Sequence, residues 1–369
     1  MQALNLEGIE EVFRPRLKLF LSVDIIGSTA YKQPLDIIND DPAEHALWAK
    51  IIQGFYKVIN DTFSEHWTDA STLLLDHGDE AQEQLLGPRP RFWKTIGDEV
   101  VFWKELTDSL QIWMTLAAWL KTIESVRDYF KKVAEESSDK SANVLDVKPT
   151  AWLAEFPVRN KAIIDARSSG SPTATIVERL TAFYDDNDDD TVADFIGPGI
   201  DVGFRISALS SARKLSISLD LAYALAKSCD RMSERAKEKE TPLDAEDYFP
   251  KKDGVSTANF TDRLRIHYSG SEQLKGVLGG IRYPRFWISC VRHGSLEEAR
   301  VGLYNKGRHG REVDWGAVRD FCFEFYKDRL KFVSKPFIVG DPCIGEFPAR
   351  YEEFLREAAL QREDWDEQG

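Results

Sequence analysis

Residues 19–29 read LFLSVDIIGST and residues 92–102 read FWKTIGDEVVF, and these two stretches decide how the chain is interpreted. Each is an apolar, strand-like run that presents an aspartate, Asp24 in the first and Asp98 in the second. Two carboxylates held on rigid neighbouring strands can bind two hard divalent cations. The Gly-Ser-Thr turn after the first carboxylate offers backbone N–H groups to phosphate. Together these features predict chemistry on a nucleoside triphosphate.

The composition is that of a globular protein with an acidic surface. The 369 residues are 43% hydrophobic, which is ample for a core, and the length allows one large domain or two smaller ones. The net charge of −14 argues against stable nucleic-acid binding by phosphate neutralisation. It does not argue against a nucleotide substrate, because a metal ion supplies local positive charge.

From the sequence we expect neither a membrane span nor an export signal. No apolar run reaches the ~18 residues that a bilayer span needs, and residues 1–16 lack the apolar segment of a signal peptide. The four cysteines (Cys229, Cys290, Cys322 and Cys343) are widely spaced and match no zinc pattern. We therefore expect a cytoplasmic protein with reduced thiols and no membrane partner.

Periodicity and turn residues predict an α+β order of elements. The expected N-terminal elements are a strand over 18–23, a helix over 44–63, an insertion or loop over 64–90, two strands within 91–103 and a helix over 107–133. After a second insertion, near 134–190, the expected elements are a strand over 147–156 within it, a helix over 201–212, a strand over 214–218, a helix over 219–227, and strands over 259–267 and 282–289. This order predicts a ferredoxin-like or polymerase-palm fold, with a central, mostly antiparallel sheet flanked by helices.

Five segments, taken in order, resemble the class III nucleotidyl cyclases. They are residues 20–29, 94–98, 194–205, 214–218 and 274–277. Each motif is weak alone, but five in the family's order make chance an unsatisfactory explanation. The resemblance implies a catalytic domain over residues 17–289 with insertions near 64–90 and 134–190, and a mainly helical C-terminal extension over 290–369.

The resemblance also implies a homodimer with two active sites at the interface and two Mg²⁺ or Mn²⁺ ions in each. Its catalytic residues would be Asp24, Asp98 and Arg205, with the Ile25 carbonyl as a further metal ligand. Arg205 would stabilise charge on the α-phosphoryl oxygens. The expected substrate contacts are Ile26, Gly27, Ser28, Thr29, Lys94, Asp194, Asp201 and Lys275.

Some of these assignments have plain structural alternatives. Asp24 and Asp98 could be a helix cap and a turn residue, Arg205 could form a salt bridge on its helix, and Lys275 could be an ordinary surface lysine. Asp201 stands where many family members have an asparagine that orients the ribose, so the sugar contacts depart from the family pattern.

The base is the open question. Lys94 and Asp194 occupy the base-reading positions of adenylate cyclases, and their donor and acceptor match adenine and cytosine. Uracil can also be read if the two contacts exchange. The bulky neighbours Phe92, Trp93, Phe195 and Phe204 are candidates for filling the volume that a purine needs, or they face the core.

Among class III enzymes, the chain most resembles the pyrimidine cyclases of the bacterial Pycsar anti-phage systems. That resemblance implies a second-messenger synthase, with UTP favoured as substrate and cyclic UMP as product, which would act on a separate effector protein. The alternatives are a cytidylate cyclase, an adenylate cyclase, or a degenerate domain that only binds nucleotide.

Overall fold

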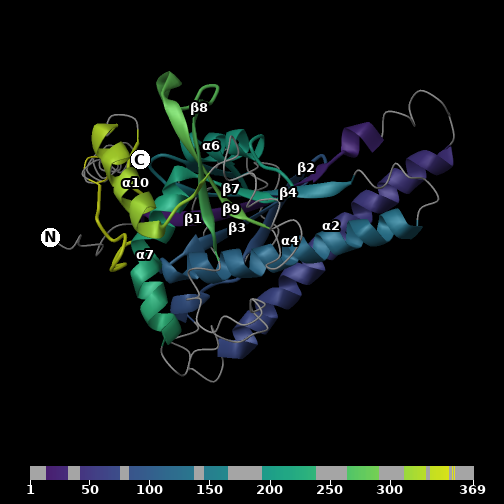
Figure 1. The fold of residues 1–369 in the computed structure, drawn as a ribbon, viewed down its shortest axis with the longest axis horizontal. Coiled ribbons are helices and arrows are strands. Elements are labelled where there is room, and N and C mark those ends of the chain that lie inside the picture. Colours follow the sequence, from purple (N-terminus) through teal and green to yellow (C-terminus); the bar gives the residue numbers. More distant parts are fainter. Residues whose placement is uncertain are drawn as a thin grey trace, which may run out of the picture.

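The chain folds around one mixed sheet (Figure 1). The computed structural model describes residues 14–31, 42–74, 83–136, 145–164, 193–237, 264–290, 311–329, 333–348, 351 and 353. The strands of the main sheet lie in the order β10-β8-β9-β7-β4-β1-β3-β2. Their bounds are β1 (Arg16–Ile26), β2 (Arg91–Ile96), β3 (Glu99–Leu106), β4 (Asp146–Phe156), β7 (Lys214–Ile217), β8 (Ile266–Gln273), β9 (Arg282–Ser289) and β10 (Arg311–Glu312).

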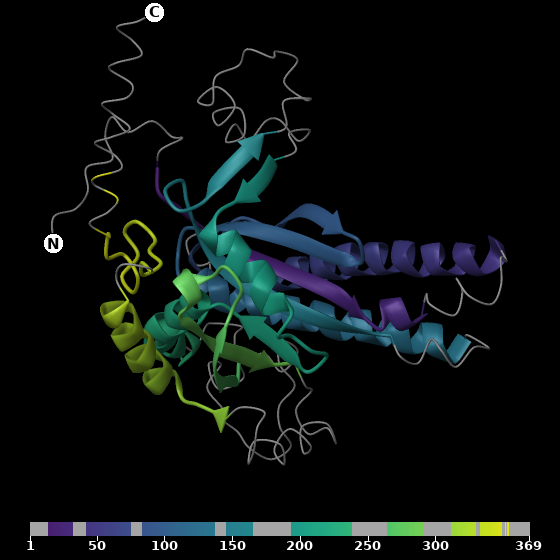
Figure 2. The ribbon, with the colours of Figure 1, turned by 90° about the horizontal axis from the view of Figure 1, so that it is seen from above.

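Neighbouring strands of this sheet run antiparallel except β4 and β7, which are parallel. A separate hairpin of β5 (Lys161–Ile164) and β6 (Ala193–Ile196) extends from the body of the molecule (Figure 2). The helices are α2 (Pro42–Leu74), α4 (Leu110–Glu136), α6 (Pro198–Ser207), α7 (Leu219–Lys237) and α10 (Trp315–Asp328). The predicted α+β fold with a mostly antiparallel central sheet is confirmed.

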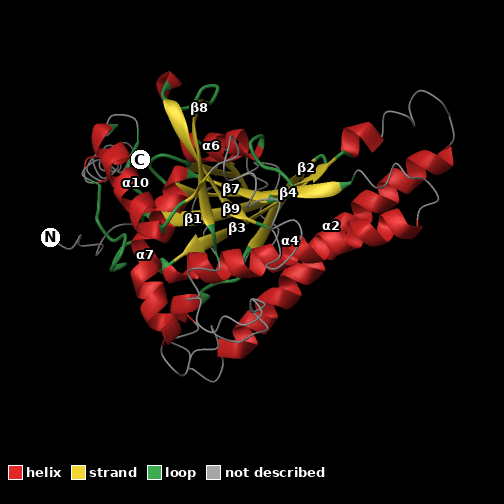
Figure 3. Ribbon diagram, viewed as in Figure 1, coloured by secondary structure: helices red, strands yellow, loops and turns green. Residues whose placement is uncertain are grey.

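Strand β1 is central, and both of its faces are buried. Leu19 and Leu21 alternate with Phe20 and Ser22, and all four side chains are at most 1% exposed. Because successive residues of a strand point to opposite faces, this run supplies two cores at once. In Figure 3, α2, α4 and α7 cover one face of the sheet and α6 lies on the other.

Helix α2 is longer than predicted, so the first part of the segment expected as an insertion or loop over 64–90 is helical rather than a loop. Residues 64–74 continue the helix, because Trp67, Ala70 and Leu74 prolong the buried stripe at helical spacing. Residues 75–82 lie outside the described part. Helix α4 runs antiparallel beside α2 in the pair that extends to the right of Figure 1.

The face beneath α6 holds an aromatic core. Phe20 stacks on Trp152 with ring centroids 5.3 Å apart, and Trp93 meets Phe195 edge to face at 4.8 Å. Gly203 of α6 lies directly on Trp152: a Cβ there would come within 2.2 Å of the indole. The absence of a side chain at this position therefore sets how closely α6 approaches the sheet.

Three other boundaries differ from the predictions. Helix α6 begins earlier, at Pro198, which fits the first helical turn because its missing N–H needs no partner there. Helix α7 continues to Lys237, beyond the predicted end at residue 227. The strand predicted over 259–267 overlaps β8 only at Ile266 and His267, and residues 238–263 lie outside the described part. The insertion residues 137–144 and 165–192 also lie outside it.

The C-terminal residues pack on the same body. Helix α10 packs on α7, where Tyr326 donates a hydrogen bond to the partly buried Asp220. Residues 333–348 are irregular rather than helical, and the Asp341 carboxylate accepts hydrogen bonds from the backbone of Ser109, Cys343 and Ile344. All four cysteines are free. Nowhere among the described residues does a helix combine the length and apolar character needed to cross a bilayer.

Candidate active site at the end of the central strands

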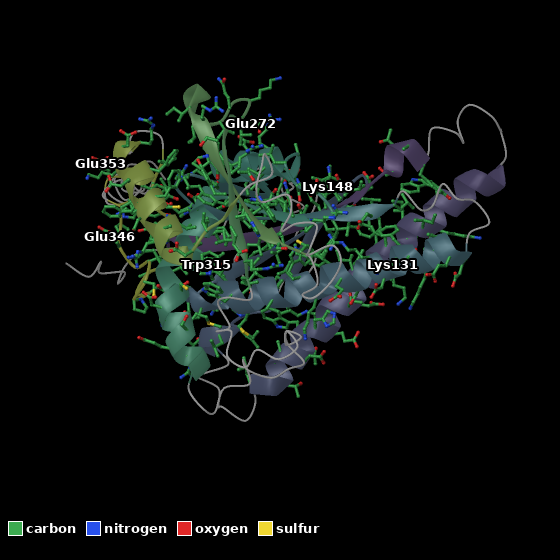
Figure 4. All side chains as sticks on the ribbon, viewed as in Figure 1. Lys131, Lys148, Glu272, Trp315, Glu346 and Glu353 are labelled. Atoms are coloured by element: carbon green, nitrogen blue, oxygen red, sulfur yellow. The ribbon has the colours of Figure 1, made fainter. Side chains whose placement is uncertain are left out.

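The first predicted metal carboxylate lies near the end of β1, between both neighbouring strands. Asp24 is opposite Glu99 of β3 and opposite Lys148 of β4. Its Oδ2 atom lies 2.8 Å from Lys148 Nζ, and both side chains are about one-quarter exposed. Figure 4 labels Lys148 on this part of β4. Sequence reasoning missed Lys148, because only the pairing of β1 with β4 brings it to the aspartate.

The second predicted carboxylate lies in the tight turn between β2 and β3. Gly97 precedes Asp98 with φ at 64°, a conformation that favours glycine. The Tyr56 hydroxyl of α2 donates a hydrogen bond to the Gly97 carbonyl. Tyr56 therefore fixes the turn that presents Asp98, and nothing in the sequence pattern marked this tyrosine.

A third acid stands beside the two aspartates. Burial raises the pKa of Glu99, and the charges of Asp24 and Asp98 raise it further. Its Oε1 atom is buried and has no hydrogen-bond partner in the described part of the chain. A buried acceptor without a partner is unusual and is satisfied if a cation or water enters.

These acids fit a divalent cation by donor type. Carboxylate and carbonyl oxygens are the ligands that Mg²⁺ and Mn²⁺ prefer. The described residues form no ready-made cluster of three or more acidic, histidine or cysteine side chains around a cation position. Asp24 is instead paired with an ammonium, so a cation would bind there by displacing Lys148 from the carboxylate.

The predicted phosphate-binding turn follows β1 directly. Gly27 has φ at 82°, and the Tyr31 amide donates to the Gly27 carbonyl at 2.8 Å. Residues 28–31 thus form one helical turn whose first N–H groups have no partner within that turn. Ile26 is still part of β1, where it pairs with Asp146 of β4.

The two predicted base-reading residues meet in one chain. Lys94 Nζ lies 2.6 Å from Asp194 Oδ1, although 100 residues separate them in sequence. The lysine ammonium also lies 4.2 Å from the centroid of the Trp93 ring, a cation–π distance. A β-bulge between Phe92 and Lys94 explains this arrangement, because it lets Trp93 and Lys94 lie toward the same face.

The four aromatic neighbours do not gather as one group, and for two of them the structure favours the alternative that they face the core. Trp93 and Phe195 are buried in the core beneath α6. Phe92 is 54% exposed and lies against Phe102, on the opposite face of β3 from the aromatic core. Phe204 is partly buried against Trp152. Two of the four side chains are therefore core residues, and one belongs to the other side of the sheet.

Asp201 and Arg205 lie one turn apart on the exposed side of α6. The buried Asn160 holds the start of this helix: its side-chain oxygen accepts from the Gly199 amide at 2.9 Å, and its nitrogen donates to the Glu155 carbonyl at 2.8 Å. Asn160 was not predicted as a site residue. It positions α6, and with it Arg205, against the end of β4.

The remaining predicted contact, Lys275, is exposed in the loop between β8 and β9. Within the described ranges, no hydrogen bond or ion pair joins Lys275, Arg205 or Asp201 to either metal carboxylate. In one chain, Asp24 lies three residues before the turn at Gly27 and opposite Glu99, the residue after Asp98, and Lys94 separately pairs with Asp194.

The sequence matches no protein-family model and no curated protein. Among solved structures, it is similar in fold to the adenylyl cyclase CyaB from P. aeruginosa, with 11% identity, a TM-score of 0.38, and coverage of 76% of this chain and 98% of that one. A bacterial light-regulated adenylyl cyclase is similar at 9% identity and a TM-score of 0.39, over 76% of this chain and 93% of that one.

A third similar structure is the guanylate cyclase domain of RhGC from Catenaria anguillulae in complex with GTP. It has 10% identity and a TM-score of 0.34, over 74% of this chain and 97% of that one. Likenesses this low carry no argument about the activity of this chain, which has to be argued from its own residues.

Proposed function

We propose that this protein is a nucleotidyl cyclase that converts UTP to 3′,5′-cyclic UMP and pyrophosphate. The observation that carries the proposal is that Asp24, near the end of β1, lies opposite Glu99 and pairs with Lys148, just before the turn at Gly27, while Asp98 lies in the adjoining turn. This combination offers oxygen ligands for divalent cations next to donors for a triphosphate. Cyclisation needs both, because the 3′-oxygen bonds to the α-phosphorus as pyrophosphate leaves.

Each residue of this site has a proposed task. Asp24, Asp98 and the Ile25 carbonyl would hold two Mg²⁺ or Mn²⁺ ions, with Glu99 as a nearby acid. When bound, these ions would lower the pKa of the ribose 3′-hydroxyl and neutralise the negative charge of the triphosphate. The N–H groups of residues 26–29 donate to phosphate oxygens. Lys148 leaves the Asp24 carboxylate and donates to phosphate oxygens instead.

The Lys94–Asp194 pair would read the base. Uracil presents a carbonyl beside a ring N–H, so Lys94 can donate to O4 while Asp194 accepts from N3. The same pair can read adenine through its amino group and N1, and cytosine through N4 and N3. The preference for UTP therefore rests on the resemblance to the Pycsar cyclases, from which an anti-phage role through a separate effector also follows.

The active site would be shared between two chains. Arg205 is exposed and makes no ion pair with a described residue, and Lys275 is exposed as well. In the proposed homodimer, each site combines Asp24 and Asp98 of one protomer with Lys94, Asp194, Asp201, Arg205 and Lys275 of its partner. Arg205 then stabilises charge on the α-phosphoryl oxygens.

A panel of labelled nucleoside triphosphates tests the proposal. Purified protein is incubated with UTP, CTP, ATP or GTP and Mn²⁺, and the products are separated by chromatography. We expect cyclic UMP with UTP as the best substrate. A cyclic product from ATP alone would make the protein an adenylate cyclase, which the Lys94–Asp194 pair also allows. Nucleotide binding without any product would show that the protein is a degenerate domain that only binds nucleotide.

The metal assignment has its own variant. Asp98→Ala should reduce turnover by more than 100-fold, as expected when a group that orders a catalytic cation is lost. It should also weaken Mn²⁺ binding, measured as free Mn²⁺ by electron paramagnetic resonance in the presence of nucleotide. Asp128→Ala, which removes an exposed carboxylate of α4 paired with Lys131, is the matched control and should change neither quantity.

A further inference from the structure

A pocket lies on the α6 side of the sheet, between the C-terminal end of α6 and strands β7, β8 and β9. Its volume is 180 Å³, and its polar lining residues are Lys214, Ser216, Ser269, Arg285 and Trp287. The remaining lining residues are apolar, and none is acidic. The proposed active site uses none of these five residues.

The charge of this pocket is unusual for an acidic protein. The whole chain carries a net charge of −14, yet the pocket gathers a lysine and an arginine. Burial lowers the pKa of Lys214, and the positive charge of Arg285 lowers it further. The pocket lining holds both positive charges, and an anion between them would offset their repulsion, as the Glu272 carboxylate already does in part for Arg285.

Arg285 is only partly satisfied by the protein. Its Nη1 lies 2.8 Å from Glu272 Oε2, and its Nη2 donates to the Ser269 carbonyl at 2.7 Å. Its Nε is buried and has no hydrogen-bond partner in the described ranges. A guanidinium held in place by two contacts presents a fixed positive charge with planar N–H donors, which suits it to recognise an oxyanion.

Trp287 lines the pocket, and His267 packs against its indole ring. Lys214 Nζ lies 4.9 Å from the centroid of the Trp287 ring, and the indole N–H donates to Ser269 Oγ at 2.9 Å. The fully buried His267 stacks on this indole at 3.8 Å. Burial, with the charges of Arg265 and Lys214, lowers the pKa of His267 to about 4, so at neutral pH it adds rigidity rather than charge.

We propose that this pocket binds a phosphate-sized oxyanion, either free or as the phosphoryl end of a larger molecule. Lys214 and Arg285 supply the positive charge, and Ser216 and Ser269 supply hydroxyl groups. The site differs from the proposed triphosphate site beside Asp24: in Figure 4, Glu272, the partner of Arg285, and Lys148, the partner of Asp24, lie well apart. Ile206, the residue after Arg205 on α6, also lines the pocket, so the pocket lies beside the helix that carries the proposed catalytic arginine.

The indole N–H signals of the tryptophans test this proposal without using enzyme activity. The full chain is labelled with ¹⁵N-tryptophan, Trp287→Phe assigns the Trp287 signal, and inorganic phosphate is titrated in EDTA so that no divalent cation is bound. We expect the Trp287 signal to shift with half-saturation in the millimolar range. A parallel titration with pyrophosphate distinguishes free phosphate from a larger phosphoryl ligand by its affinity.

Variants locate the bound anion. Lys214→Met and Arg285→Lys should each weaken the phosphate effect on Trp287 at least tenfold, while the other tryptophan signals show that the fold is kept. Lys148→Met is the matched control, because it removes a cation from the same face of the sheet at the proposed active site. No shift of Trp287, or a shift lost in Lys148→Met but kept in Lys214→Met, would overturn the proposal. Asp98→Ala should retain the shift, so failure here is separable from failure of the cyclase proposal.

Discussion

At the scale of single residues, Lys148 is the side chain whose role the strand pairing reveals. Its ammonium lies 2.8 Å from the carboxylate that the sequence marks as a metal ligand. A cation and Lys148 therefore compete for Asp24, and phosphate oxygens give the lysine another partner. Binding of the metal ion and binding of the triphosphate would then each strengthen the other.

Removing that competitor should strengthen metal binding when no nucleotide is present. We predict that Lys148→Met binds Mn²⁺ severalfold more tightly than the unaltered protein, because one nearby positive charge at a partly exposed site contributes about 1 kcal/mol. The same variant should bind the nucleotide more weakly and raise its KM. Electron paramagnetic resonance of free Mn²⁺ measures the first effect, and weaker Mn²⁺ binding would contradict the competition.

A second prediction concerns Lys18, a lysine buried beneath α6. Its Nζ lies 3.0 Å from Glu105 Oε2 and 4.0 Å from the centroid of the Trp103 ring. Burial lowers the pKa of Lys18 from 10.5 to about 8, and Glu105 only partly opposes this. Between these two pKa values the unfolded chain binds more protons than the folded one, so the free energy of unfolding should rise with pH.

The expected rise is roughly 1–2 kcal/mol between pH 8 and pH 9.5. Urea unfolding at several pH values measures it as the difference between the unaltered protein and Lys18→Met, because other groups titrate in both proteins. The thiols of Cys290 and Cys322, whose pKa values burial raises, act in the opposite direction, and the buried Lys104, whose pKa burial lowers, acts in the same direction. Lys18→Met should remove this rise. Parallel pH profiles for the two proteins would show that Lys18 does not titrate in that range.

At the scale of elements, the position of α6 sets where Asp201 and Arg205, the residues of the proposed site that it carries, lie. The sequence predicted a helix here, with Asp201 and Arg205 on it, but not how closely it approaches the sheet. Gly203 lies against Trp152, and Asn160 holds the first turn. The position of Arg205 follows from these two contacts rather than from any property of the arginine.

Gly203→Ala should therefore destabilise the protein. The new Cβ would lie 2.2 Å from Trp152 Cε2, and overpacking of this kind costs about 1–3 kcal/mol. Urea unfolding measures the loss, and turnover should fall as well because α6 has to move. Gly316→Ala in α10 is the matched control: its nearest contact is 3.1 Å, to the side chain of Asp314, so the expected cost is smaller. Equal stability of the two variants would contradict the close packing of α6.

At the scale of the whole molecule, the sheet places Asp24 opposite Glu99 and Lys148 and lets Lys94 pair with Asp194 in one chain, but leaves Arg205 and Lys275 exposed. Two chains in an isologous pair would create two equivalent sites, each drawing on both protomers. The proposed dimer thus follows from a site that a single chain leaves incomplete.

Mixing two inactive variants tests this sharing. Asp24→Ala and Arg205→Ala should each be inactive alone, because each removes a component of both sites. After mixing and reassociation, half of the dimers contain one intact site, so activity should return to about one-quarter of the unaltered value. A mixture that stays inactive, although subunit exchange is shown by light scattering of tagged chains, would place Arg205 in the same site as Asp24 of its own chain.

The sequence by itself determined the α+β order, the two aspartates at their strand ends and turns, and the identities of Lys94 and Asp194. These are local properties: hydrophobic periodicity and turn residues act over a few positions. Where the periodicity was weak, at residues 64–74, the prediction of a loop was wrong, because burial against the core prolonged the helix.

The tertiary structure alone decided which residues meet. Pairing of β1 with β4 brought Lys148 to Asp24, a bulge in β2 placed Trp93 and Lys94 toward one face, and Asn160 fixed α6 against β4. Such contacts depend on register and packing between segments far apart in the sequence, and a shift of one residue would reverse the face of every side chain in a strand. The chemistry of the site is therefore encoded locally, but its geometry is a property of the assembled sheet.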